Sequence, residues 1–210
     1  MTPMPILWSF RRCPYAMRAR LAIRSSGVRV ALREILLRDK PAAFLSTSPK
    51  GTVPVIDTGT QVIAESRDIM LWALAQSDPG GWCDMPDEGH ELIDQNDGPF
   101  KQALDRTKYA VRYPDVDVSE ERAKALVFLH DLNSRLNSQQ FLMGSRRTLA
   151  DMAILPFVRQ FANTDRAWFD AQKMMPLSGW LDRFLVSDEF AAIMTKYTPW
   201  EPGQDGILFP

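Results

Sequence analysis

The sequence predicts two parts of different fold class, an α/β domain followed by an all-α domain. The N-terminal third has the order strand, helix, strand, which builds a parallel strand pair with a right-handed crossover. A stretch rich in Pro and Gly follows at 77–86 and is typical of a linker. From Asp87 onward, apolar residues recur at helical spacing. These three observations separate the two domains.

The first domain, residues 1–76, is predicted to have the element order βαβαββα. An apolar run at 4–9 indicates the first strand, and Pro14 opens a helix that ends at Ser26-Gly27, where glycine suits a helix C-terminus. The other predicted elements are a strand at 28–35, a short helical piece from Lys40-Pro41, strands at 52–56 and 61–64 joined by a hairpin turn, and a helix ending at Gln76 with Ser66 as its N-cap.

Pro54 lies inside the apolar run at 52–56. A proline removes a donor from the strand ladder, so it belongs at a sheet edge or a bulge. The alternative is a cis peptide bond, which costs X–Pro bonds little. The residues around Pro54 leave both arrangements open.

The second domain, residues 87–210, is predicted to be helical after the linker at 77–86. Its first helix is expected to reach about Tyr113, with a bend at Gly98-Pro99. Thr148 and Asp151 have the spacing of a capping box, although Asp replaces the usual Glu or Gln. Further helices are expected from Ser119 to Leu136 and at 152–161, 177–184 and 189–197, before an irregular tail at 198–210.

The composition is that of an ordinary soluble globular protein, with 45% hydrophobic and 24% charged residues among 210. The formal net charge of −1 gives no general attraction to nucleic acid or membranes, so neither is an expected partner. The charge is uneven, because residues 1–76 hold 11 Lys and Arg against 5 Asp and Glu. This basic segment suits an anionic small ligand, with a chance surface bias as the alternative.

A cytoplasmic location is expected. The N-terminus lacks the features of a signal peptide, and no apolar run approaches membrane-spanning length. The two cysteines, Cys13 and Cys83, are too far apart in sequence to indicate a disulfide framework. Cys83 lies in the predicted linker and is given no role. The two cysteines and two histidines lack metal-ligand spacing, so no metal site is predicted.

Cys13 is the candidate catalytic residue, because it lies between the first strand and the first helix. At a helix N-terminus, unpaired N–H groups and the helix dipole favour thiolate over thiol. Arg11, Arg12 and Arg18 add positive charge nearby. A lone cysteine is more often a small buried hydrophobe. Pro14 and the switch from strand to helix favour the reactive interpretation.

These motifs resemble those of the cytosolic glutathione transferase superfamily. Cys-Pro-Tyr-Ala after the first strand resembles the thioredoxin-like fold, and the helical domain completes the likeness over nearly the whole chain. The nearest resemblance is to the cysteine-containing branch, the omega-like transferases and the two-domain glutaredoxins. The motifs that carry it are Arg12 to Ala16, Lys40-Pro41, Val53-Pro54, Glu65-Ser66 and the Thr148…Asp151 box. Two positions depart from it: Ala16 replaces the second cysteine of a dithiol glutaredoxin, and Arg147 replaces an apolar staple residue.

The resemblance implies glutathione as co-substrate and assigns roles to particular residues. The backbone of Val53, beside a cis-Pro54, would pair with the tripeptide like an added strand. Ser66 and the start of its helix would hold the γ-glutamyl carboxylate, and Glu65 the γ-glutamyl ammonium. Lys40 would pair with the glycyl carboxylate, with a solvated surface lysine as the alternative. The full set of expected glutathione contacts is Tyr15, Lys40, Val53, Pro54, Glu65 and Ser66.

An apolar co-substrate pocket has weaker support. Aromatic residues could form its wall, although core packing is the commoner role for such side chains. The candidates are Phe10, Tyr109, Tyr113 and Trp168.

The leading hypothesis is a glutathione-dependent thiol transferase in which Cys13 forms a mixed disulfide with glutathione. The resemblance implies dehydroascorbate reductase or deglutathionylation activity on a disulfide or a small electrophile. The alternatives are a non-catalytic binding or regulatory protein of the same fold, and a glutathione-dependent isomerase or dehalogenase. Both a homodimer and a monomer are open, and the physiological second substrate is not predicted.

Overall fold

The computed structural model describes residues 3–210 and divides them into two compact units. The sheet unit consists of 3–80 together with Ser187–Pro210. The helical unit consists of Gly81–Val186. The first division, after Gly80, falls within the predicted linker at 77–86. The C-terminal segment Ser187–Pro210 was predicted to belong to the second domain, but it belongs to the sheet unit.

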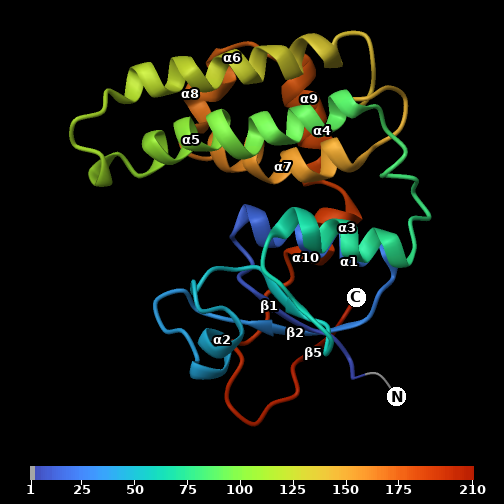
Figure 1. Cartoon of the computed structure of the whole chain (residues 1–210). Helices are drawn as coiled ribbons and strands as arrows, with labels where there is room; N and C mark the ends of the chain where they lie inside the picture. Colours follow the sequence, from blue (N-terminus) through green and yellow to red (C-terminus); the bar gives the residue numbers. More distant parts are fainter. Residues whose placement is uncertain (1–2) are drawn as a thin grey trace. The chain divides into compact units, whose positions relative to one another are not determined.

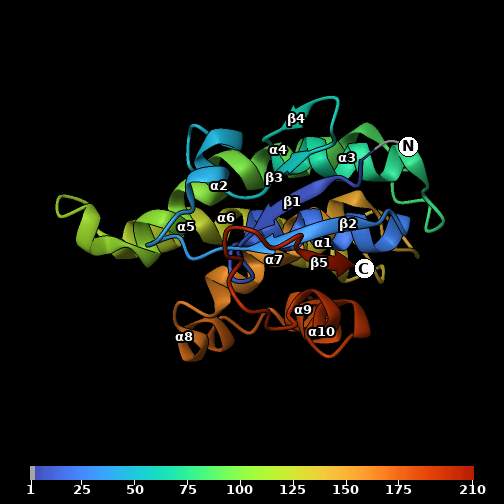
Figure 2. The same ribbon diagram turned by 90° about the horizontal axis from the view of Figure 1, so that it is seen from below.

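The sheet unit contains, within residues 3–210, a mixed five-stranded sheet in the order β4-β3-β1-β2-β5 (Figure 2). Strand β1 pairs parallel with β2 and antiparallel with β3, so the predicted strand-helix-strand crossover is confirmed. The elements are β1 (Ile6–Ser9), α1 (Pro14–Ser26), β2 (Val30–Glu34), α2 (Ala42–Thr47), β3 (Val55–Asp57), β4 (Val62–Ile63), α3 (Ser66–Gln76), α10 (Asp188–Ile193) and β5 (Ile207–Phe209).

The sheet has a covered face on each side. Helices α1 and α3 pack together on one face, and α2 lies on the other (Figure 1). Leu7 and Trp8 are successive residues of β1, so their side chains point to opposite faces, and both are buried. Trp8 packs against Phe44 of α2, with ring centroids 5.7 Å apart, and against Trp200 at 4.9 Å. The core on the α2 side of the sheet, around Trp8, therefore joins α2 and the C-terminal tail to the sheet.

The prediction of an irregular tail in an all-helical second domain is wrong at the C-terminus. Strand β5 pairs antiparallel with β2, with Leu32 opposite Ile207. Glycines suit the approach to this strand: Gly206 has a φ of +105°, and a Cβ there would lie 3.1 Å from Leu32 O. The pairing joins residues far apart in the chain, and short-range periodicity carries no signal of it.

The helical unit is built from helices and short helical turns. They are α4 (Asp87–Gln95), a π-helical segment (Asn96–Phe100), α5 (Lys101–Lys108), a 3₁₀ turn (Ala110–Arg112), α6 (Val118–Leu136), α7 (Leu149–Ala162), α8 (Arg166–Ala171) and α9 (Met175–Leu185). The predicted bend in the first helix coincides with the π-helical segment, which contains Pro99. Helix α8 was not predicted.

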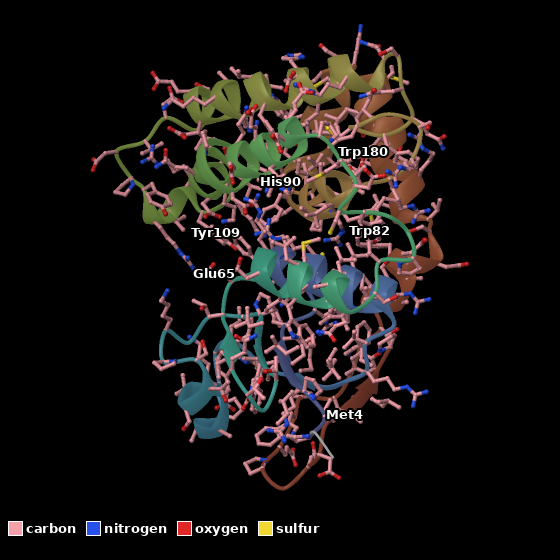
Figure 3. The ribbon with its side chains drawn as sticks, turned by 45° about the vertical axis from the view of Figure 1, so that its right-hand side comes forward. Met4, Glu65, Trp82, His90, Tyr109 and Trp180 are labelled. Atoms are coloured by element: carbon pink, nitrogen blue, oxygen red, sulfur yellow. The ribbon has the colours of Figure 1, made fainter. Side chains whose placement is uncertain are left out.

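The capping box at the start of α7 is confirmed. Asp151 Oδ2 accepts the N–H of Thr148 at 2.9 Å and its hydroxyl at 3.0 Å. Asp151 Oδ1 accepts the N–H of Leu142 at 2.9 Å and Nε1 of Trp180, labelled in Figure 3, at 3.0 Å. Asp151 is fully buried. Its carboxylate therefore joins the connector before α7 to helix α9.

Candidate functional site

Cys13 is the N-cap residue of α1, as the sequence predicts. The preceding turn is closed by its N–H, which donates to Phe10 O at 3.0 Å, and its own C=O accepts the N–H of Met17 at 2.9 Å. Pro14 occupies the first helical position, where a missing N–H costs no hydrogen bond. The residue is partly exposed. Its thiol thus lies at a helix N-terminus within reach of solvent.

A pocket of about 520 Å³ lies beside Cys13 in the sheet unit. It brings together Cys13 and all six residues that the resemblance assigned to glutathione. The lining residues are Cys13, Tyr15, Leu37, Lys40, Lys50, Gly51, Thr52, Val53, Pro54, Ala64, Glu65 and Ser66. They come from the start of α1, the loop before α2, the loop before β3 and the start of α3.

The loop before β3 lies beside the thiol. Cys13 Sγ lies 3.6 Å from Val53 O, at the distance of a weak S–H···O contact. The Val53–Pro54 peptide is cis, which confirms what the family resemblance predicted. Val53 is 8% exposed, and it belongs to the same core cluster as Trp8 and Phe44. Packing thus fixes the Val53 side chain, while its backbone lines the pocket.

The start of α3 differs in detail from the prediction. Glu65, labelled in Figure 3, is the N-cap residue, and Ser66 is the first helical residue instead of the cap. Ser66 is buried, and its Oγ accepts from Nε of Arg18 at 2.9 Å. Arg18 is 2% exposed and its guanidinium lies over the Tyr15 ring, 5.2 Å from the centroid. Arg18 therefore links two pocket residues, a role that the sequence analysis missed.

Two lysines bring positive charge to the pocket lining. Lys40 and Lys50 are both exposed and both line the pocket. Lys40 packs over Gly51, because a Cβ on that glycine would lie 3.1 Å from Lys40 Nζ. Lys50 Nζ lies 3.9 Å from Glu65 Oε1, in an ion pair whose side chains are 77% and 71% exposed. Such an exposed pair contributes little to stability, so both groups are available to a charged ligand.

Lys50 was missed by the sequence analysis, together with Leu37, Gly51, Thr52 and Ala64. Each is a sequence neighbour of a predicted contact, within three residues of Lys40, Val53 or Glu65. Extending the predicted contacts to their loop neighbours would have found them.

The predicted aromatic wall is not assembled in this pocket. Phe10 packs beside the core cluster of the second sheet face, and the Arg12 guanidinium lies 5.3 Å from its ring centroid. Phe10 does not line the Cys13 pocket. Its ring continues the core of β1 and α2, and its role in a separate co-substrate pocket stays a prediction.

Tyr109, Tyr113 and Trp168 belong to the helical unit. Tyr109, labelled in Figure 3, lies under the Arg112 guanidinium at 4.5 Å, and Tyr113 is 38% exposed. Trp168 packs edge-on against Phe161, with centroids 6.0 Å apart. The contact of Trp168 is the core packing that the sequence analysis weighed against a pocket role.

Within 3–210, no group of three or more His, Cys, Asp or Glu side chains is arranged to hold a metal ion. Within the same range, every helix is too short or too polar to cross a membrane.

Known proteins share sequence and fold with this chain. Residues 7–81 match the family model of the glutathione S-transferase N-terminal domain. An 86-residue segment is 35% identical to glutathione S-transferase omega-1 of Sus scrofa, over 40% of this chain and 35% of the relative. A 147-residue segment is 28% identical to glutathione S-transferase DHAR2 of Arabidopsis thaliana, over 69% of this chain and 64% of the relative. The matches thus span less than two thirds of either relative.

The fold is also that of a solved glutathione transferase. The crystal structure of a glutathione transferase family member from Pseudomonas fluorescens pf-5, with two glutathione bound, matches with a TM-score of 0.75 at 18% identity. The match covers 91% of this chain and 92% of that one. Residues 7–81 thus have the glutathione S-transferase N-terminal domain, the two relatives support a place for this chain in the glutathione transferase superfamily, and the solved structure shows the same fold.

Proposed function

We propose that this protein is a glutathione-dependent thiol transferase whose nucleophile is Cys13. One observation carries the proposal: Cys13 shares a pocket with every residue that the family resemblance assigns to glutathione. A thiol at a helix N-terminus, open to a pocket with two lysines, is suited to attack a disulfide of an anionic tripeptide.

Glutathione would be held by its backbone and by both charged ends. The C=O and N–H of Val53 would pair with the cysteinyl amide as an added strand would. The first N–H groups of α3 and the Ser66 hydroxyl would hold the γ-glutamyl carboxylate. Glu65 would accept from the γ-glutamyl ammonium, and Lys40 would pair with the glycyl carboxylate. This pose puts the glutathione sulfur beside Cys13, because Cys13 Sγ lies 3.6 Å from Val53 O.

The reaction would proceed by two thiol–disulfide exchanges. The Cys13 thiolate attacks the glutathionyl sulfur of a mixed disulfide, forms a Cys13–glutathione disulfide and expels the substrate thiolate, which takes up a proton. A second glutathione thiolate attacks the glutathionyl sulfur and forms oxidised glutathione, which returns Cys13 to its thiolate. In sum, the mixed disulfide and one reduced glutathione give the substrate thiol and oxidised glutathione. Because Ala16 carries no thiol, a second glutathione resolves the mixed disulfide.

We include dehydroascorbate reduction and deglutathionylation in the proposed activity, with a disulfide or small electrophile as second substrate. The partial match to glutathione S-transferase DHAR2 supports testing dehydroascorbate first. Conjugation of glutathione to electrophiles is expected to be weak, since a cysteine occupies the place of a hydroxyl nucleophile. We also propose a cytoplasmic setting, because a reactive thiol needs reducing surroundings. A homodimer is the assembly to test against a monomer.

Mass spectrometry after exposure to oxidised glutathione tests the proposal. We expect one glutathione adduct, on Cys13, which excess reduced glutathione removes. Cys83→Ser is the matched control and should gain the same adduct, whereas Cys13→Ser should gain none on the sheet unit. An adduct confined to Cys83, or no adduct at all in the wild type, contradicts the assignment.

A further inference from the structure

The turn that carries Cys13 is held by a side chain from the neighbouring strand. The turn runs from Phe10 to Cys13 and closes through the Cys13 N–H and Phe10 O, at 3.0 Å. This closure does not use the N–H of Arg11, the second residue of the turn. Glu34 Oε1, at the end of β2, accepts that N–H at 2.6 Å. A carboxylate therefore holds a backbone donor that the turn closure does not use.

Glu34 is itself fixed by Arg20 of α1. Glu34 is 7% exposed and Arg20 is fully buried, and the two form an ion pair through Arg20 Nη2 and Glu34 Oε2. Arg20 also donates from Nε to Ser9 Oγ at 2.8 Å and from Nη1 to Ile193 O at 3.0 Å. Burial lowers the pKa of the Arg20 guanidinium, and the Glu34 carboxylate counteracts that effect. The carboxylate thus has little freedom to leave the Arg11 N–H.

The same cluster extends to the C-terminal tail. Arg11 Nη1 donates to Met194 O at 3.1 Å, and the N–H of Trp200 donates to Glu34 O at 2.7 Å. The C-terminal tail, which β5 attaches to the sheet, therefore bonds to both Arg11 and Glu34. Backbone and side chain of Glu34 both serve as acceptors, one toward the tail and one toward the turn.

We propose that Glu34 is a positioning residue for Cys13. By holding the Arg11 N–H, it keeps the turn in the form that presents the Cys13 sulfur at the start of α1, beside Val53 O. Glu34 does not line the Cys13 pocket, so it acts through the turn and not on a ligand there. The inference rests on the proposed thiol chemistry of Cys13, but it concerns how that thiol is presented.

The test compares two variants that differ only in the acceptor at position 34. Both carry Arg20→Met, so that neither buries an uncompensated charge. One adds Glu34→Gln, whose carbonyl oxygen still accepts from the Arg11 N–H, and the other adds Glu34→Met, which has no acceptor of that kind. A Cys83→Ser background leaves Cys13 as the only thiol. Circular dichroism checks that each variant is folded.

The readout is the rate of Cys13 alkylation by iodoacetamide across a series of pH values. Because this reaction needs no glutathione, it judges the positioning role even if the proposed transferase activity fails. We expect the Glu34→Met form to react about tenfold more slowly than the Glu34→Gln form at neutral pH, since a misplaced reacting group loses rate steeply. Its pH profile should also move to higher pH. Equal rates and equal profiles in the two folded variants would overturn the proposal.

A further variant and a measurement on the wild type complete the test. Ser9→Ala removes an Arg20 contact but leaves the Glu34 bond to the Arg11 N–H, so it should lower the melting temperature without slowing alkylation. An equal slowing in Ser9→Ala would indicate a merely structural role. If the Glu34→Met form does not fold, amide hydrogen exchange of wild-type Arg11 decides. Slow exchange supports the bond to Glu34, and exchange at the unprotected rate contradicts it.

Discussion

Two helices of this protein start at residues that the sequence marks, and they use them in opposite ways. Cys13, before α1, turns its sulfur toward Val53 O in the pocket. Thr148, before α7, gives its N–H and hydroxyl to Asp151 within the same helix start. The first arrangement leaves a helix N-terminus available to a ligand, and the second satisfies it internally. A helix start can therefore serve chemistry or stability, and the direction of its first side chain decides between them.

The largest effect is expected from Cys13→Ser. It should lower thiol transfer by about a thousandfold or more, because a neutral alcohol does not exchange with disulfides. Glutathione binding should remain, since the Val53, Glu65 and Ser66 contacts do not need the sulfur. Disulfide exchange with a glutathione mixed disulfide and retention on a glutathione column measure the two properties. Full activity in Cys13→Ser would show that another group is the nucleophile.

The next largest effect is expected from a change at the start of α7, where Asp151 accepts the Thr148 donors. Asp151→Ala should cost about 3 kcal/mol or more in unfolding free energy, because it leaves buried donors without their acceptor. The affected donors are the N–H groups of Leu142 and Thr148 and the indole of Trp180. Urea unfolding measures the cost. Glu91→Ala, at an exposed position of α4, is the control and should stay within about 0.5 kcal/mol.

The pH dependence of stability sharpens the same comparison. Burial raises the pKa of Asp151 above its unfolded value, although its hydrogen bonds oppose the effect. The contribution of this group is therefore complete below the unfolded pKa and is lost as pH rises through the folded pKa. The stability advantage of the wild type over Asp151→Asn should shrink as pH rises, measured by urea unfolding at several pH values. An advantage that grows with pH would mean that the hydrogen bonds outweigh desolvation.

A smaller effect is expected from Thr148→Ala, which removes the cap hydroxyl. The cost should be about 0.5–2 kcal/mol in unfolding free energy. Thr148→Ser keeps a hydroxyl and should recover most of the loss. Glutathione affinity, measured by calorimetry, should be unchanged in both variants. A large loss of affinity would contradict the absence of Thr148 from the set of residues that line the Cys13 pocket.

The smallest effect is expected from Cys83→Ser. Cys83 is exposed in the helical unit, outside the pocket-lining set. Thiol transfer should be unchanged, and unfolding free energy should move by no more than about 0.5 kcal/mol. If Cys83→Ser lost thiol transfer and Cys13→Ser kept it, the nucleophile would not be Cys13.

The sequence alone predicted the features that depend on neighbouring residues. Cys13 followed by Pro14 specifies a helix start, and Thr148 with Asp151 specifies a capping box, because each pair acts within one helical turn. The local pattern around Pro54 allowed a cis Val53–Pro54 bond, the family resemblance predicted it, and the structure confirms it. Element type follows from periodicity over a few residues, so the change from α/β to all-α was also visible.

Tertiary structure decided the features that join distant residues. The pairing of β5 with β2, the Arg18 bond to Ser66 and the bond from the Arg11 N–H to Glu34 each depend on a fold that brings separate segments together. Phe10 joined the core because α2 and the sheet lie beside it, a circumstance that no local pattern encodes. The physical reason is that hydrogen bonds and packing act over a few ångströms in space, whereas sequence patterns report only on residues close in the chain.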